Sequence, residues 1–581
     1  MLELPPTFVF GLWRLDVEQQ ILSRSGKLIP LAPKELKTLA VLAQNSGRLV
    51  TKEELISRVW PDTFVGDGSL ARNVSVLRKI LGEGLIQTVS KKGYRFVAPV
   101  ETGPLLPWIG SMPKPGLAVL PFANLTGDAS LECLIEGITE ETIRGLGRAF
   151  GQHLRVVALA STLRYRQTDQ TVQQIARALG VEYLLTGRVR KDKDALRLQL
   201  ELVEARDVAS VWIESFEIGM QEDRRLQRRI AACVARSLKT ELLPSSRSAR
   251  PHRVAATAAR QSYLFGRYYW NRRTEAYLRQ SIQCFESAIA NDPRYGEAYA
   301  WLAFSHIILT DWGVAHPKRS MMQAEGAAVR ALVLDEGLSE AHVALAWTKV
   351  ILHKDWTGAE ASLLRAIQLN PSNPWSYHWY AYLGASQGRI ADSLGLNAQA
   401  LALDPFSVPI NYVRAWILYL LGDFEGAKEQ SRATVELEPA HPGPHAYLGM
   451  AYLQLGEYER GIQEMQLAND YGGNMSSLRI LLGHAYALGS HRAEANQIAS
   501  ELESVAQSTY VCAYYMAILY AGLGDFQRVA YWLLRSFEDS DPWVLYLKMD
   551  PRFAAFRSDR RFADVEQALR GPVRNLDQNF R

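Results

Sequence analysis

The hydrophobic pattern of the first hundred residues predicts a small sheet, three helices and a closing hairpin. Apolar and polar positions alternate through FVFGLWRLDVEQQILSRSG, as they do in strands with one buried face. Patterns with a helical period follow over 33–46, 52–60 and 69–81, each bounded by Pro, Gly, Ser or a capping Thr. Two more alternating runs, LIQTVS and GYRFVAPV, are joined by Lys91, Lys92 and Gly93. This order of elements is that of a winged helix-turn-helix.

The third predicted helix, Ser69–Leu81, is amphipathic and basic. Its apolar residues Leu70, Val74, Leu77 and Leu81 recur at the spacing of one buried face. The polar residues lie on other faces, where Arg can pair with guanine and Asn with adenine in the major groove of double-stranded DNA. The lysines of the hairpin are placed for phosphates or the minor groove. The candidate DNA-binding residues are Ser69, Arg72, Asn73, Ser75, Arg78 and Lys79 in the helix and Thr88, Lys91, Lys92 and Arg95 in the hairpin.

Two stretches rich in Pro, Gly and Ser, 101–114 and 243–257, are predicted linkers. They separate a head, 1–100, from a middle domain, 115–242. In the middle domain LAVLPF and LRVVAL read as strands, and LECLIEGITEETIRGLGR and TVQQIARALG as helices, before a run of alternating strands. The middle domain is therefore predicted to be a small α/β domain.

The C-terminal half repeats with a period of 34 residues. Pro371, Pro405 and Pro439 keep this spacing in the phrases LNP, LDP and LEP, and the phrases LGDF, LGEY and LGDF recur around the turn glycines of the units. This period and these residues are typical of tetratricopeptide repeats (TPRs). We predict a TPR α-solenoid of about eight units over 258–545, followed by a helical cap or tail over 546–581. The fold class is thus multidomain, α+β and all-α.

Charge is concentrated in the head. Residues 1–100 hold 14 Lys and Arg against 9 Asp and Glu, whereas the rest of the chain holds 51 against 52. A basic head on a neutral body is typical of a DNA-binding module. The four cysteines form no CxxC pair, which favours a reducing cytoplasm. The N-terminus has no signal-peptide pattern, and the best apolar run, Val511–Leu523, is too short to span a bilayer. We expect a cytoplasmic protein with no membrane contact.

The run GSLARNVSVLRKILG followed by LIQTVSKKGYRFVAPV resembles the OmpR/PhoB-type winged helix of CadC- and ToxR-like bacterial transcription regulators. The resemblance implies that Ser69–Leu81 is the recognition helix, that Ser90–Gly93 is the wing, and that Tyr94 and Phe96 are core anchors. It also implies a contact between the loop Pro61–Gly68 and RNA polymerase, as in some members of the family. We expect two departures from the family, namely that no receiver domain precedes the head and that the membrane span of CadC-like members is missing.

The middle domain has a second resemblance. The phrases LAVLPFANLTGD, IARALGVEYLLTGRVRK and LRLQLELVEARD resemble the TolB-like domain that accompanies TPR arrays in bacterial regulators. The resemblance implies a fold and a sensor or assembly role. It supplies no catalytic residue.

Two aromatic trios are candidates for partner binding on the concave surface of the array. Each trio has the spacing of one helical face. They bind an unknown protein or peptide if they are exposed, and they pack within or between repeats if they are not. The trios are Trp375, His378 and Tyr382, and Tyr412, Trp416 and Tyr419.

Motifs of enzymatic chemistry are missing from the sequence. It contains no G-x4-GK[ST], no GxGxxG after a strand, no HExxH and no GxSxG. We expect no catalytic residue, no metal and no cofactor. His441 and His445 stand four residues apart, but the prolines between them favour a turn over a metal-binding helix face. Glu140, Glu141 and Arg144 are interpreted as a solvated helix face.

Three readings of the function remain open at this stage. The first is a sequence-specific DNA-binding transcription regulator whose TPR arm senses a signal or recruits a partner. The second is a TPR scaffold whose winged helix no longer reads DNA. The third is a signalling enzyme, because TolB-like segments can neighbour cyclase domains. The basic helix favours the first reading.

Overall fold

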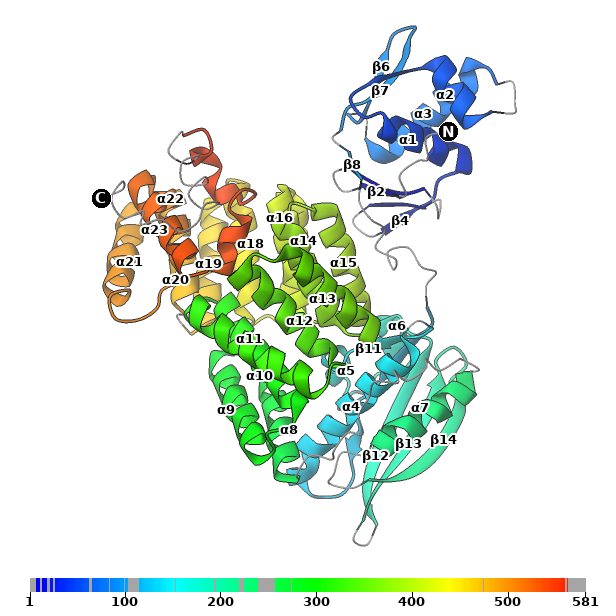
Figure 1. Ribbon diagram of the computed structural model, residues 1–581, viewed down its shortest axis with the longest axis vertical. Helices are drawn as coiled ribbons and strands as arrows, with labels where there is room; N and C mark the ends of the chain where they lie inside the picture. Colours follow the sequence, from blue (N-terminus) through cyan, green and yellow to red (C-terminus); the bar gives the residue numbers. More distant parts are fainter. Residues whose placement is uncertain are drawn as a thin grey trace. The chain divides into compact units, whose positions relative to one another are not determined.

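The computed structural model divides the chain into two compact units (Figure 1). One unit comprises Met1–Pro113 with Gln387–Gln399, and the other comprises Lys114–Ser386 with Ala400–Arg581. The residues that the structure describes are 7–10, 13–17, 21–24, 27–61, 65–82, 84–98, 100–102, 114–151, 153–192, 195–218, 224–238, 257–272, 274–473, 475–559 and 562.

The head opens with an antiparallel sheet in the strand order β4-β3-β2-β1-β8. Alternate residues of β1 and β2, such as Phe8, Phe10 and Leu15, are buried, as the sequence alternation predicts. Strand β8 falls inside the predicted linker 101–114, so that boundary was wrong, and the sheet extends the head through Thr102. The strands are β1 (Thr7–Phe10), β2 (Trp13–Asp16), β3 (Ile21–Arg24), β4 (Lys27–Ile29) and β8 (Glu101–Thr102).

Three helices follow as predicted: α1 (Pro33–Gln44), α2 (Lys52–Val59) and α3 (Asp67–Leu81). Helix α2 begins where the Thr51 hydroxyl accepts a hydrogen bond from the Glu54 backbone N–H at 3.1 Å. Helix α3 begins at Asp67, before the predicted Ser69, and ends at Leu81. It is followed by Gly82, whose positive φ of 94° favours glycine.

The wing is a three-stranded antiparallel sheet in the order β5-β7-β6. Its strands are β5 (Leu49–Thr51), β6 (Ile86–Val89) and β7 (Gly93–Phe96). A Cβ atom at Gly93 would lie 2.1 Å from the Val50 carbonyl oxygen, so the close pairing of β5 with β7 requires glycine there. Tyr94 and Phe96 are buried on β7, and the Phe96 ring meets Phe10 edge-on at 4.9 Å. Both anchor the head core, as the resemblance implied.

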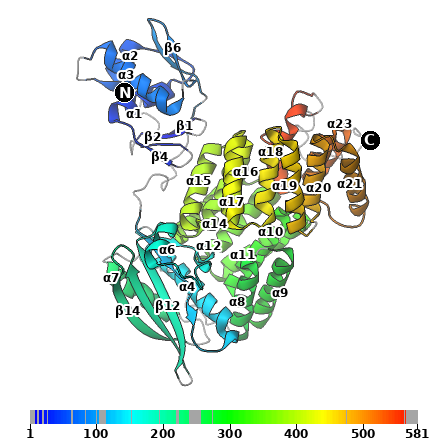
Figure 2. The same cartoon turned by 180° about the vertical axis from the view of Figure 1, so that it is seen from behind.

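The middle segment forms the predicted α/β domain (Figure 2). Its sheet has the order β11-β9-β12-β13-β14, with β11, β9 and β12 parallel and β12, β13 and β14 antiparallel. Strand β9 is buried along its whole length, which explains its continuous apolar sequence. The strands are β9 (Gly116–Val119), β10 (Ala123–Asn124), β11 (Arg155–Val157), β12 (Tyr183–Asp192), β13 (Ala195–Glu204) and β14 (Ala209–Ile218), and the helices are α4 (Glu132–Phe150), α5 (Leu159–Leu163), α6 (Val172–Leu179) and α7 (Arg224–Leu238), with a short 3-10 turn η1 (Ala129–Leu131).

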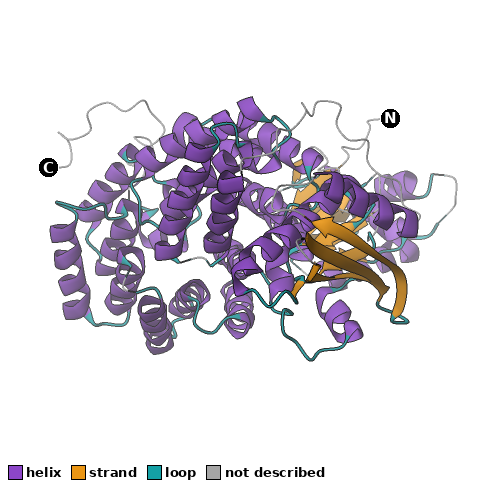
Figure 3. Cartoon of the chain, turned by 90° about the horizontal axis from the view of Figure 1, so that it is seen from below, coloured by secondary structure: helices purple, strands orange, loops and turns teal. Residues whose placement is uncertain are grey.

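The C-terminal part is an array of helices that lie side by side (Figure 3). The repeat glycines close the first helix of a unit: Gly422 and Gly524 take the left-handed conformation directly after their helices. The helices are α8 (Thr257–Asn271), α9 (Glu275–Asn291), α10 (Gly296–Asp311), α11 (Pro317–Leu334), α12 (Ser339–Thr348), α13 (Trp356–Leu369), α14 (Pro374–Ser386), α15 (Ile390–Leu403), α16 (Val408–Leu421), α17 (Phe424–Leu437), α18 (Pro442–Gln454), α19 (Tyr458–Tyr471), α20 (Ser476–Leu488), α21 (Arg492–Val505), α22 (Ala513–Leu523) and α23 (Phe526–Glu538). A π-helical turn η2 (Lys349–His353) and two 3-10 turns, η3 (Pro542–Tyr546) and η4 (Pro551–Phe556), complete the described elements.

Helix α4 of the α/β domain packs on α8 of the array through buried ion pairs. Arg260 on α8 pairs with Glu141 at 2.9 Å, and both side chains are buried. Arg267, also on α8, pairs with Glu140. The interpretation of Glu140, Glu141 and Arg144 as a solvated face was therefore wrong, because their partners come from a helix more than a hundred residues later.

Two expectations can be compared with these elements. The predicted fold class is confirmed: a winged helix-turn-helix, a small α/β domain and a helical solenoid occur in that order. Among the described helices, none combines the length and the apolar composition that crossing a bilayer requires.

Candidate functional site

The outward face of α3 carries a stripe of exposed polar residues. Ser69, Arg72, Ser75 and Lys79 are all exposed, whereas Leu70, Val74 and Leu77 on the opposite face are almost completely buried. With 3.6 residues per turn, the polar set and the apolar set point in opposite directions from the helix axis. The amphipathic pattern therefore places four of the six predicted helix residues together on one accessible face.

Asn73 does not belong to this face, and its prediction as a base-reading residue is corrected. Its side chain is buried, and its Nδ2 donates to the Thr38 hydroxyl of α1 at 3.1 Å. The Thr38 hydroxyl in turn donates to the Lys34 carbonyl at 2.7 Å. An amide that holds α1 against α3 inside the head is not available to an adenine edge.

Arg78 and Thr88 are tied to each other within the head. The Arg78 guanidinium donates through Nε and Nη2 to the Ile86 carbonyl, at 3.0 and 2.7 Å. Its Nη2 also donates to the Thr88 hydroxyl at 2.6 Å. These bonds fasten the end of α3 to strand β6. Thr88 is exposed and Arg78 is half-buried, so their role as DNA contacts stays a prediction.

The hairpin turn presents two adjacent lysines to solvent. Lys91 and Lys92 are exposed between β6 and β7, and Lys91 has a left-handed φ of 60° that turns the chain. Arg95 is half-buried on β7, where it pairs in register with Gln87 of β6. The two lysines form the accessible cationic tip of the wing, and Arg95 lies behind them.

The loop for which contact with RNA polymerase was predicted is only partly described. Pro61 is exposed, and Asp67 and Gly68 belong to the first turn of α3. The stretch 62–64 lies outside the described residues. The contact with RNA polymerase stays a prediction.

The two aromatic trios of the array are mostly buried. The prediction that they form an exposed partner-binding surface is therefore corrected. His378, Tyr382, Trp416 and Tyr419 are at most 4% exposed, and only Trp375 and Tyr412 are half-buried. Burial raises the pKa of Tyr382 well above its usual range, and the negative charge of Asp311 adds to the shift. The trios instead pack between repeats, which was the alternative interpretation of their spacing.

The burial of these rings comes from the C-terminal end of the array. Trp543 and Tyr546 of η3 meet the Trp416 ring edge-on at 5.8 and 4.6 Å. The Tyr546 hydroxyl donates to the Tyr382 carbonyl at 3.2 Å. The chain's own η3 segment thus covers the surface on which a partner was expected, and no repeat spacing pointed to it.

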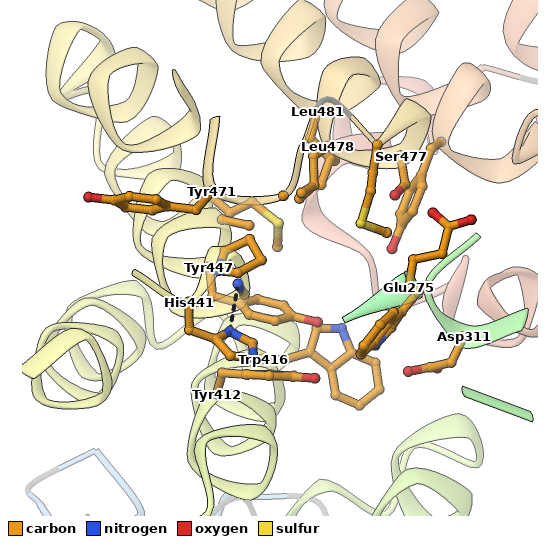
Figure 4. Close-up of a pocket in the computed structure, with 18 of the residues that line it drawn as sticks. Glu275, Asp311, Tyr412, Trp416, His441, Tyr447, Tyr471, Ser477, Leu478 and Leu481 are labelled. Carbon is orange, nitrogen blue, oxygen red and sulfur yellow. Dashed lines mark hydrogen bonds between the residues drawn. The ribbon is translucent and has the colours of Figure 1, made fainter. Parts of the chain in front are cut away.

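Beside these rings a cavity of about 180 Å³ remains open among the inner helices (Figure 4). Its walls include Tyr412 and Trp416 from the predicted trios, together with Tyr447, Tyr515 and Trp543, which the sequence analysis did not single out. Tyr412 and Tyr447 stack with ring centroids 5.4 Å apart.

A metal site finds no support among the described residues, where no three His, Cys, Asp or Glu side chains gather as possible ligands. The expected turn around His441 and His445 was wrong, because α18 begins at Pro442 and includes His445. His441 caps this helix by accepting the Gly443 N–H at 3.1 Å, while His445 pairs with Glu464 at 2.7 Å. Both imidazoles have structural roles.

Two protein families match parts of the chain. Residues 26–96 match the family described as "Transcriptional regulatory protein, C terminal", and residues 114–233 match "HilA/YgeH-like transcriptional regulator, second domain". The first match confirms the OmpR/PhoB-type winged helix of the head. The second concerns the α/β domain, whose TolB-like resemblance stays a prediction.

Individual relatives include two transcription regulators and a putative cyclase. The transcriptional regulator HilA of Salmonella typhimurium is 25% identical over 422 residues, which cover 71% of this chain and 73% of HilA. The transcriptional activator CadC of Escherichia coli is 32% identical over 101 residues, 16% of this chain and 20% of CadC. The solved DNA-binding domain of CadC is 30% identical and aligns over 17% of this chain and 100% of that domain, with a TM-score of 0.16. A putative adenylate cyclase of Rhizobium meliloti is 27% identical over 244 residues, 40% of each protein.

Proposed function

We propose that this chain is a sequence-specific, DNA-binding transcription regulator, with α3 as the helix that enters the major groove. The observation that carries the proposal is the exposed stripe of Ser69, Arg72, Ser75 and Lys79 on the face of α3 opposite its buried leucines. Arg72 and Ser75 lie in the N-terminal and central part of the helix, where recognition helices contact bases. Lys79, near the C-terminal end, is assigned to phosphate.

The wing supplies the second contact. Lys91 and Lys92 are exposed on a hairpin whose Gly93 pairs closely with β5. Two ammonium groups at the tip of such a hairpin are suited to adjacent phosphates or to the minor groove. Contacts of this kind fix the position of the head on the duplex and are independent of base sequence.

Similarity to HilA and CadC favours a transcription regulator over the second candidate function, a TPR scaffold whose winged helix does not read DNA. The same similarity supports it over the signalling enzyme, because the match to the adenylate cyclase covers only part of either protein. We further propose that the α/β domain and the helical array form the part of the regulator that senses a signal or recruits a partner. The buried pairs between α4 and α8 support their acting as one body.

The proposal is tested by the salt dependence of DNA binding. The full chain is expected to bind duplex DNA with an affinity that falls linearly on a logarithmic scale as salt rises, because bound phosphates release counterions. Replacing both wing lysines, Lys91→Ala with Lys92→Ala, should weaken binding to all sequences alike and reduce the slope by about 2. Fluorescence anisotropy across a salt series measures both quantities.

A matched control removes the same charge from another hairpin. Arg190 and Lys191 are exposed at the end of β12, so Arg190→Ala with Lys191→Ala should leave the slope unchanged. DNA binding that is insensitive to salt, or an equal change of slope in both double variants, would contradict the assignment of the wing.

A further inference from the structure

Helix α11 carries a stripe of exposed apolar side chains on its outer face. Met322, Val329 and Val333 are 60%, 45% and 62% exposed, and their spacing of seven and four residues places them on one side of the helix. Gly326 lies on the same side, and no other element lies within 4 Å of the position that its Cβ would take. The opposite side packs on α10 and α12. An exposed apolar row of this kind is typical of a protein–protein contact surface.

The equivalent side of α17 is charged. In both helices the N–H of the C-cap residue bonds to the carbonyl four residues earlier, so equivalent positions can be counted back from the C-cap. The positions that hold the three apolar side chains in α11 hold exposed, charged residues in α17, namely Glu425, Arg432 and Glu436. The apolar stripe is therefore a property of the α11 unit and is not required by the packing of the repeat.

The charges at the two ends of α11 are the reverse of those that favour a helix on its own. Lys318 and Arg319 are exposed in its first turn, which contains no acidic residue, and its last turn contains no basic residue. Glu336 follows the helix and is exposed. The helix dipole disfavours cations at the N-terminus and anions at the C-terminus. An antiparallel partner helix of the same sequence compensates for this, because it brings an acidic end beside each basic end.

The stripe is complementary to itself when two copies of α11 lie antiparallel. A two-fold axis midway between positions 327 and 328 sets Met322 of one copy against Val333 of the other. The same axis sets Val329 against Gly326, where no side chain prevents the two helices from approaching closely. Each large side chain of the stripe therefore meets either another apolar side chain or a glycine.

The charges beside the stripe fit the same arrangement. In a two-fold antiparallel pair, each flank of one helix meets the same flank of the other. Arg319 and Glu336 share one flank and stand equally far from the axis, so each meets the other across it. Arg330 lies on this flank too and comes nearest to Gln323 of the second copy. Glu325 lies on the other flank, where an imidazole of η2 in its own chain is bonded to it at 2.6 Å. Like charges are thus nowhere directly opposed along the pair.

We propose that this chain forms a two-fold dimer in which the apolar stripe of α11 is covered by the same helix of a second copy. Contact along one helix of 18 residues, about 27 Å long, is small compared with the interface of an obligate dimer. The association is therefore reversible, with a dissociation constant in the micromolar range. The pairing goes beyond DNA recognition, and only its consequence, that one assembly brings two heads to DNA, rests on the proposed function.

The dimer is tested by sedimentation equilibrium of the full chain without DNA. The unchanged chain should show a monomer–dimer equilibrium. Val329→Glu should raise the dissociation constant about tenfold or more, because it places two unpaired carboxylates in the apolar contact. Val505→Glu is the matched control, since Val505 is an exposed valine at the end of α21, and it should dissociate like the unchanged chain. Circular dichroism melting checks that both variants are folded.

Cross-linking tests the antiparallel register. Chains with Met322→Cys and chains with Val333→Cys are mixed and oxidised mildly with diamide. The mixture should form disulfide-linked dimers many times faster than either variant alone, because position 322 meets position 333 and neither meets itself. Cys133 and Cys284 are half-buried, and the unchanged chain gives the background from the natural cysteines.

Three outcomes would overturn the inference. They are a chain that stays monomeric at hundreds of micromolar, equal dissociation of Val329→Glu and Val505→Glu, and cross-linking of either cysteine variant alone as fast as that of the mixture. Because these measurements contain no DNA, their failure leaves the proposed DNA recognition untouched, and loss of DNA binding leaves the dimer untouched.

Discussion

Leu77→Ala is expected to unfold the head and to abolish binding to every DNA sequence. The Leu77 side chain is completely buried in the core of the head, in the same cluster as Leu39, Val74 and Phe96. Truncating a buried leucine costs about 2–5 kcal/mol, through lost burial and the cavity left behind. That cost is a large part of the stability of a small domain, which is about 5–15 kcal/mol.

Hydrogen exchange of the full chain, followed by mass spectrometry, measures this effect where it occurs. Peptides from α1, α2 and α3 should lose protection in Leu77→Ala, while peptides from the array keep theirs. Val76→Ala is the matched control, because Val76 is the neighbouring residue of the same helix but is only half-buried. Protection and DNA binding that survive Leu77→Ala would show that α3 does not depend on this core.

The local elements of the head could be predicted from the sequence because their signals are local. The alternation around Phe8 and Leu15, the Thr51 cap and the glycine after α3 each act within a few residues. The same holds for the 34-residue period, since each repeat glycine turns the chain directly after its own helix. Short-range rules therefore sufficed for the fold class.

The environment of individual side chains could be predicted only in part. On α3, Asn73 and Arg78 flank the apolar stripe, and residues at such flanks can face either solvent or a neighbouring element. The contact with Thr38 on α1 turns Asn73 inward, and the bonds to the Ile86 carbonyl hold the half-buried Arg78 against β6. The helical period gives the direction of a side chain, but it does not say which other element occupies that direction.

Long-range contacts explain the larger errors. The aromatic trios looked like a partner surface because each lies on one helical face, yet Tyr546 reaches Tyr382 from 164 residues away. The pairing of Glu141 with Arg260 spans 119 residues. The period that identifies the repeats predicts neither of these two contacts, because η3 and α4 lie outside the repeating unit.

Arg72→Ala is expected to remove sequence preference while leaving the head folded. Arg72 is exposed on α3 and takes no part in the hydrogen bonds that fasten α3 to α1 and β6. A bidentate contact between an arginine and a guanine is worth about 1–3 kcal/mol of discrimination. The preference for the cognate site over scrambled DNA should therefore fall about tenfold or more, and binding to scrambled DNA should change less.

The measurement begins with selection of the preferred site from a random duplex pool by the unchanged chain, followed by competition binding of each variant. Asn73→Ala is the informative comparison, because Asn73 adjoins Arg72 but holds α1 through Thr38. It should lower the protection of α1 and α3 and weaken binding to cognate and scrambled DNA alike. If folded Arg72→Ala keeps its full preference, or if Asn73→Ala alone loses it, the exposed face of α3 is not the surface that reads the bases.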